Sequence, residues 1–77
     1  MNASELQMKF GTGLAAWRKQ RGFTQVTLGK AAGLHRTFIA DVEHGRRNVS
    51  LQSMAKLAGA LEISIPDLFQ PPPTRRT

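Results

Sequence analysis

Basic and hydroxyl side chains form two short groups within residues 33–50, GLHRTFIADVEHGRRNVS. The first group is Arg36 and Thr37, and the second contains Arg46 and Arg47. An arginine can donate two hydrogen bonds to the O6 and N7 atoms of guanine, and a threonine can bond a base edge. Arginine also binds phosphate well. These residue types therefore predict recognition of a nucleic acid.

Composition supports an acidic partner. The 77 residues contain 11 Lys and Arg against 5 Asp and Glu, a net charge of +6. Nucleic acid is the commonest partner of so basic a small domain, and an anionic membrane is the second. The basic residues are spread over loops and helix ends, which disfavours membrane binding, and no apolar stretch approaches the roughly 20 residues that span a bilayer. The chain has no cysteine, and its first residues do not resemble a signal peptide, so we expect a cytoplasmic protein without metal or cofactor.

Apolar spacing predicts one all-α domain of five short helices over residues 1–70, followed by a proline-rich basic tail, 71–77, that we expect to be mobile. The expected helices run from about the cap Ser4 to Gln20, over Gln25–Ala32 after the cap Thr24, from His35 or Arg36 to Gly45, from the cap Ser50 onward, and from the cap Ser64 to Phe69. Their inward residues include Leu6, Phe10, Leu14 and Trp17 in the first helix, and Leu51, Met54, Leu57, Ala58 and Leu61 in the fourth. Gly11 and Gly13 are expected to weaken the first helix.

The segment from Gln25 to Val42 has the spacing of a helix-turn-helix. Two helices that meet at a wide angle need a very small residue at the crossing and a glycine where the turn enters the left-handed region. Gly29 fits the crossing, and Gly33 fits the turn. The apolar positions that agree are Leu28, Ala32, Leu34, Ile39 and Val42. An ordinary helical hairpin is the alternative.

In the helix that follows the turn, a rotation of 100° per residue directs Ile39, Val42, His35 and Glu43 inward. The residues expected to contact bases are Arg36, Thr37, Phe38, Ala40 and Asp41. Asp41 has two open interpretations. It could accept a hydrogen bond from a cytosine N4, or it could hold Arg36 or Thr37 in place.

The residues around the helix starts suit phosphate, because free backbone N–H groups and the helix dipole favour anions there. The residues expected to contact phosphate are Gln25, His35, Arg46, Arg47, Asn48 and Ser50. An enzyme is not expected, because the two histidines lie nine residues apart on one helix without a nucleophile or a carboxylate pair nearby. Trp17 and Phe10 fall at core spacings, which disfavours stacking on single-stranded nucleic acid.

Residues from about Phe10 to Phe69 resemble the Cro and CI repressor type of helix-turn-helix domain, also called the xenobiotic response element family. Within that family, HRTFIADVEHGRRNVSL is most similar to the controller proteins of restriction-modification systems. The resemblance implies a lambda-repressor-like fold and base contacts at Arg36, Thr37 and Phe38. It also implies a partly buried ion pair between Arg18 and Glu43.

Two residues depart from the family pattern. Controllers often have Tyr at the position of Phe38, and many have a small residue at that of Asp41.

We therefore expect a transcriptional regulator that binds a palindromic double-stranded DNA site as a homodimer. Whether it activates or represses is left open. The expected dimer surface lies at the ends of the fourth and fifth helices, with Ile63, Ile65, Leu68 and Phe69 as its residues. The alternative is an antitoxin or phage-type regulator whose role includes binding a partner protein.

Overall fold

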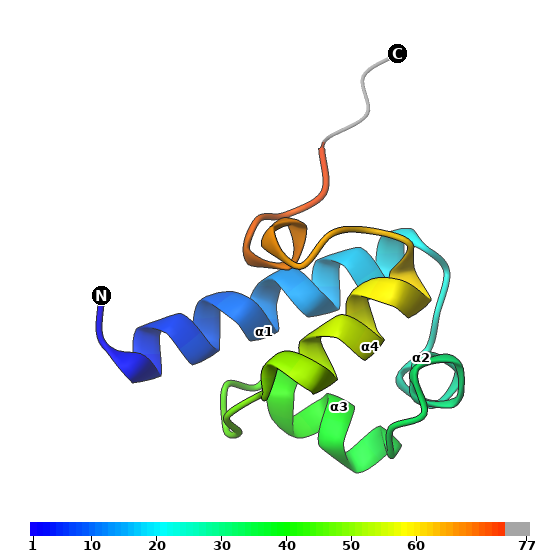
Figure 1. Cartoon of the computed structure of the whole chain (residues 1–77), viewed down its shortest axis with the longest axis horizontal. Coiled ribbons are helices and arrows are strands. Elements are labelled where there is room, and N and C mark those ends of the chain that lie inside the picture. The colour runs from blue at the N-terminus through cyan, green and yellow to red at the C-terminus, as the bar shows by residue number, and fades with distance from the viewer. Residues whose placement is uncertain (74–77) are drawn as a thin grey trace.

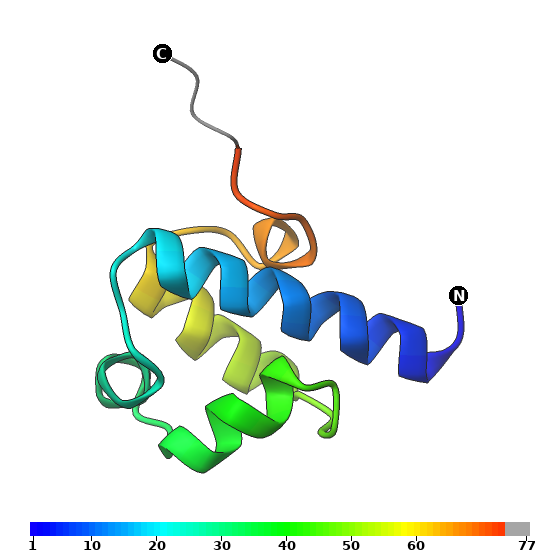
Figure 2. The same cartoon turned by 180° about the vertical axis from the view of Figure 1, so that it is seen from behind.

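Four α-helices and one 3₁₀ helix make up the part of the chain that the structure describes, residues 1–73, in a computed structural model (Figure 1). The elements are α1 (Ala3–Gln20), α2 (Gln25–Ala32), α3 (Arg36–Glu43), α4 (Leu51–Leu61) and η1 (Pro66–Phe69). No strand occurs within these residues. Helix α1 lies between η1 on one side and α3 and α4 on the other (Figures 1 and 2). No helix among residues 1–73 combines the length and the apolar character needed to cross a membrane.

The all-α prediction is confirmed, but the expected count of five α-helices is wrong. The fifth element is a single 3₁₀ turn of four residues, η1. Pro66 at its start lacks a backbone N–H, and Pro71 follows closely, so too little chain is left between them for an α-helix. Ser64 and Asp67 close the turn, because each backbone N–H donates to the other's side chain, at 3.1 and 3.4 Å. The expected tail begins at Pro71–Pro73, which form no helix, and residues 74–77 lie outside the described part.

Helix α1 begins earlier than predicted, because Asn2 rather than Ser4 is its N-cap. The Asn2 side chain accepts from the Glu5 N–H at 2.8 Å, and the Glu5 carboxylate accepts from the Asn2 N–H at 3.1 Å. This reciprocal pair is a capping box, which satisfies two backbone donors that have no partner inside the helix. Leu6, expected to point inward, is 46% exposed.

Two of the other predicted caps are confirmed, whereas Ile65 rather than Ser64 is the N-cap of η1. Thr24 caps α2 through reciprocal bonds with Thr27, and Ser50 caps α4 by accepting from the Ser53 N–H at 3.0 Å. Leu51, which was expected to face inward, is 73% exposed. It is the first residue of α4, and Leu57 and Leu61 form the buried side of that helix.

The core is one cluster that all five elements share. Its fully buried members are Leu14, Leu28, Ile39, Val42, Leu57, Leu61 and Leu68. Gly11 and Gly13 let α1 approach its neighbours, because a Cβ at Gly11 would overlap the carbonyl oxygen of Val42 and one at Gly13 that of Leu68. These two glycines are therefore the contact points that fix α3 and η1 against α1.

Candidate nucleic-acid interface

The turn between α2 and α3 is the element that orients the expected reading helix. Gly33 adopts the left-handed conformation, with φ 72° and ψ 35°. The Gly29 carbonyl accepts from the Gly33 N–H and from the Leu34 N–H. A Cβ at Gly29 would overlap the Leu34 carbonyl oxygen. The predicted roles of Gly29 at the close crossing and of Gly33 in the left-handed turn are confirmed, and the start of α3 packs closely against α2.

At the start of α3, His35 is the N-cap. Its Nδ1 atom accepts a hydrogen bond from the Thr37 N–H at 3.0 Å. Arg36 and Thr37 follow in the first turn and are exposed, whereas Ile39 and Val42 are buried. The first turn of α3 therefore presents an arginine and a hydroxyl outward on a helix that is anchored from behind.

The implied ion pair between α1 and α3 is present. Arg18 Nε donates to Glu43 Oε2 at 2.6 Å, and the two side chains are only 12% and 6% exposed. Arg18 Nη1 also donates to the carbonyl oxygen of Phe23 at 3.0 Å. A buried carboxylate is stable only when its oxygens are hydrogen-bonded, and each oxygen of Glu43 has a partner here.

Gln25, expected at phosphate, contributes to the same network. Its Nε2 atom donates to Glu43 Oε1 at 3.0 Å. An amide group carries two hydrogens, so one of them is still free to meet a phosphate at the start of α2. The contact with Glu43 fixes the direction of the Gln25 side chain.

The loop between α3 and α4 folds back on α3. The Arg46 N–H donates to the Asp41 carbonyl oxygen at 2.9 Å. The Arg47 guanidinium lies 5.1 Å from the centre of the Phe38 ring, and its Nη2 atom is 3.4 Å from Asp41 Oδ2. Neither open interpretation of Asp41 anticipated this contact, because its partner is Arg47 rather than Arg36 or Thr37. Phe38 and Asp41, which are expected to contact bases, are thus in contact with Arg47, which is expected to contact phosphate.

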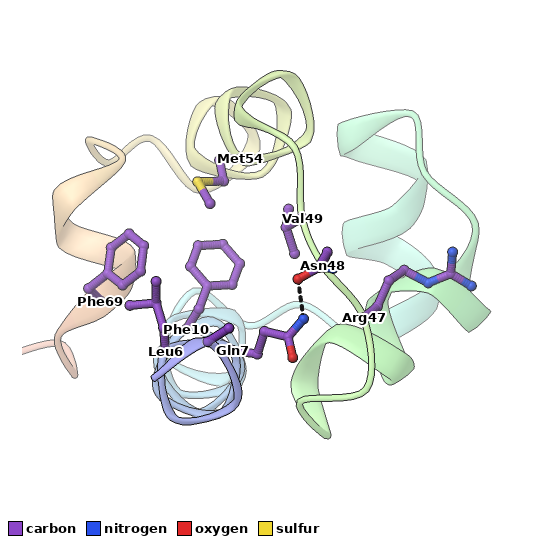
Figure 3. Close-up of a pocket in the computed structure, with 9 residues that line it drawn as sticks. Leu6, Gln7, Phe10, Arg47, Asn48, Val49, Met54 and Phe69 are labelled. Carbon is purple, nitrogen blue, oxygen red and sulfur yellow. Dashed lines mark hydrogen bonds between the residues drawn. The ribbon is translucent and has the colours of Figure 1, made fainter. Parts of the chain in front are cut away.

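The same loop is attached to α1 by a contact that the sequence did not indicate. The Gln7 side-chain amide donates to Asn48 Oδ1, as Figure 3 shows. Asn48 keeps its own amide N–H groups for another acceptor. The Ser50 hydroxyl is occupied with Ser53, both as cap and as donor. No periodic pattern predicts Gln7, since a polar residue in an exposed helix turn has many possible orientations.

Beneath this loop lies a small apolar hollow of about 120 Å³, between α1, the loop and η1 (Figure 3). The side chains that surround it include Leu6, Phe10, Val49, Met54 and Phe69. The Phe10 and Phe69 rings meet edge to face at 5.1 Å.

The expected dimer residues do not share one environment. Leu68 is fully buried in the chain's own core, so the prediction that it contributes to a dimer surface is wrong. Ile63, Ile65 and Phe69 are half-buried. Apolar character alone does not distinguish a residue of a dimer surface from a residue of the chain's own core.

Trp17 is the residue that attaches η1 to α1. The Trp17 indole N–H is shared by the carbonyl oxygens of Asp67 and Gln70, both at 2.8 Å. Arg21 lies over the Trp17 ring at 5.2 Å and donates to the Leu61 carbonyl oxygen. The indole donor of α1 therefore holds the second residue of the 3₁₀ turn and the residue that follows the turn.

This architecture defines a class. The family model described as Helix-turn-helix matches residues 14–68, most of the chain. The chain belongs to the helix-turn-helix family, whose members are DNA-binding transcriptional regulators, and it is similar to restriction-modification controller proteins.

One solved structure and two sequence relatives illustrate the similarity to known regulators. The crystal structure of the restriction-modification controller protein C.AhdI from Aeromonas hydrophila has a TM-score of 0.79 and 44% identity, over 80% of this chain and 94% of that one. Control protein C.MunI from Mycoplasma sp is 31% identical over 86% of this chain and 90% of its own length. The immunity repressor protein of Bacillus phage phi105 is 43% identical over 75% of this chain. This chain spans only 40% of that repressor's length.

Proposed function

We propose that the protein binds a palindromic double-stranded DNA operator as a homodimer and regulates transcription from it. The observation that carries this proposal is the exposed first turn of α3, with Arg36 and Thr37 outward, on a helix whose inner side is docked by Ile39 and Val42. A helix presented in this way fits the major groove, where base edges carry a distinct pattern of donors and acceptors.

The contacts divide into two kinds. Arg36, Thr37 and Ala40 face base edges. The starts of α2 and α4, with Gln25, Arg46, Arg47 and Asn48 beside them, meet the phosphates on either side of the groove. Phosphate contacts set the register of a protein on DNA, and base contacts supply sequence preference.

Two copies are needed because one eight-residue helix makes few specific contacts. In a symmetric dimer, two such helices enter successive major grooves about one helical turn apart. Half-burial of Ile63 and Ile65, in the segment between α4 and η1, supports this segment as the contact between copies.

Selection of bound sequences from random duplex DNA tests the proposal. The expected result is an enriched inverted repeat whose half-sites lie about one helical turn apart. Binding should weaken steeply as salt is raised, because each neutralised phosphate releases counterions. Recovery of unrelated sequences, with affinity that depends on salt alone, would reduce the protein to a nonspecific DNA binder.

The similarity to C.AhdI and C.MunI supports a controller role in a restriction-modification system. The similarity to a phage immunity repressor favours phage regulation as the second candidate. The position of the selected operator in the source genome distinguishes them, since a controller operator is expected beside restriction-modification genes and a phage operator within a prophage. An antitoxin-like role instead predicts a second protein that co-purifies with the native protein.

A further inference from the structure

Arg47 is held by two contacts from α3 in the absence of DNA. Its guanidinium lies over the Phe38 ring at 5.1 Å, and Nη2 is 3.4 Å from the Asp41 carboxylate. The two contacts use different properties of arginine, because the aromatic ring meets the flat face of the cation and the carboxylate accepts from its N–H groups. Together they restrict a long side chain that is otherwise half exposed.

The backbone of the loop is held as well. The Arg46 N–H donates to the Asp41 carbonyl oxygen, and Asn48 accepts from Gln7 of α1. In Figure 3 the Arg47 side chain points away from the apolar hollow and extends over α3. The loop therefore has one residue on each side of Arg47 tied to a helix, and the guanidinium has a defined position.

A carboxylate on the side of α3 that faces DNA repels phosphate unless a cation lies next to it. Asp41 has its cation, Arg47. A side chain that is already ordered loses less conformational entropy when it binds than a free one does. The negative charge of Asp41 thus has a use that requires no base contact.

We propose that Asp41 and Phe38 are positioning residues for Arg47, which place its guanidinium for a backbone phosphate, and that neither of them reads a base. The inference rests on the proposed function, since it concerns the same interface. It assigns roles to the two residues at which this chain departs from the controller pattern.

The test is a double-mutant cycle on the duplex that random selection yields for the unaltered protein. Asp41→Asn is measured with Arg47 present and in an Arg47→Ala background. Without Arg47, the amide only removes repulsion and binding should tighten. With Arg47, the amide also releases the guanidinium. The dissociation constant of Asp41→Asn divided by that of the Asp41 protein should therefore be at least about threefold larger with Arg47 present than in the Arg47→Ala background.

Glu5→Gln is the matched control for charge. It removes one carboxylate charge and keeps an oxygen that can accept from the Asn2 N–H in the capping box. Its effect on affinity should be the same in both backgrounds, within about twofold.

Phe38→Leu gives a second arm in which no charge changes. It should weaken binding about three- to tenfold when Arg47 is present and less than about twofold in the Arg47→Ala background. Repeated selection with Asp41→Asn and with Phe38→Leu should return the base preferences of the unaltered protein. Urea unfolding of each variant checks that the fold is retained.

Three results decide the matter. Lost preference at a base pair in either variant would assign that residue to base reading and overturn the inference. If Asp41→Asn changes affinity by the same factor with and without Arg47, and Phe38→Leu does so too, the inference is also overturned. An enriched operator would still leave the proposed function intact in that case. Failure of the unaltered protein to enrich any duplex would defeat the proposed function and, with it, this inference.

Discussion

The Arg18 guanidinium donates two hydrogen bonds to the Glu43 carboxylate, from Nε to Oε2 at 2.6 Å and from Nη2 to Oε1 at 3.2 Å. This pair connects the long helix α1 to the last residue of α3, the expected reading helix. Both side chains are largely buried, so water replaces a removed partner only in part. The orientation of α3 therefore depends on a polar contact as well as on apolar packing.

Arg18→Ala should lower the free energy of unfolding by about 3 to 5 kcal/mol, because it leaves the Glu43 carboxylate buried with only Gln25 as a donor. Urea denaturation measures the loss. Arg46→Ala, at an exposed loop position, is the control and should change stability by less than about 0.5 kcal/mol. A loss below about 1 kcal/mol for Arg18→Ala would be typical of a surface pair and would contradict the prediction.

Arg36→Ala should relax base preference and cost about 1 to 3 kcal/mol on the selected operator, because it removes a donor pair from a base edge. Arg46→Ala should instead weaken binding to all duplexes about equally and flatten the dependence of log K on log salt by about one unit. Titration of operator and scrambled duplexes at several salt concentrations measures both. If the two variants behave alike, the division into base and phosphate contacts is wrong.

Gly13→Ala should destabilise the fold by about 1 to 3 kcal/mol, because the added Cβ overlaps the Leu68 carbonyl oxygen and η1 must shift. Gly59→Ala makes the same chemical change within α4, where no atom outside the helix's own backbone lies within 4 Å of the added Cβ. It should raise stability by about 0.5 to 1 kcal/mol. Thermal unfolding compares the two, and similar changes in both would show that helix propensity alone governs these sites.

Ile65→Glu should convert the proposed dimer to a monomer with little loss of secondary structure, since Ile65 is half-buried within one chain. Sedimentation at tens of micromolar measures the association state. Leu68→Ala should act on folding instead and lower the free energy of unfolding by about 2 to 5 kcal/mol, because Leu68 belongs to the core. A monomeric unaltered protein at that concentration would remove the homodimer from the proposed function.

The sequence predicted the helix-turn-helix well, because its demands are local and steric. Gly29 and Gly33 are required by a close crossing and a left-handed turn, and both sit where those demands arise. Thr24 and Ser50 are predicted as N-caps for a similarly local reason, because a hydroxyl residue directly precedes each helix. The Asn2 to Glu5 capping box has a sequence signature of its own, a cap residue followed three residues later by Glu, and it is the alternative to Ser4 that the structure contains.

Other features depend on how side chains and elements meet, which no periodicity encodes. Helix propensity predicts Gly11 and Gly13 to be weak points of a helix, whereas in the structure they are the positions at which α3 and η1 approach α1 closely. Leu68 lies in the core rather than at a dimer surface, because η1 is docked on α1. The contact of Arg47 with Asp41 depends on the path of a loop, so only the three-dimensional structure could connect them.

Trp17 gives this chain a built-in optical probe. It is the sole tryptophan in a sequence without tyrosine, so emission excited at the red edge of aromatic absorption comes from one ring. Trp17 is 8% exposed, and its indole N–H donates to the carbonyl oxygens of Asp67, within η1, and of Gln70, just after it. The wavelength of its emission maximum and its fluorescence lifetime therefore report whether η1 is docked on α1, with no added label. Fraying of this terminal turn can be followed separately from melting of the helices, which circular dichroism records.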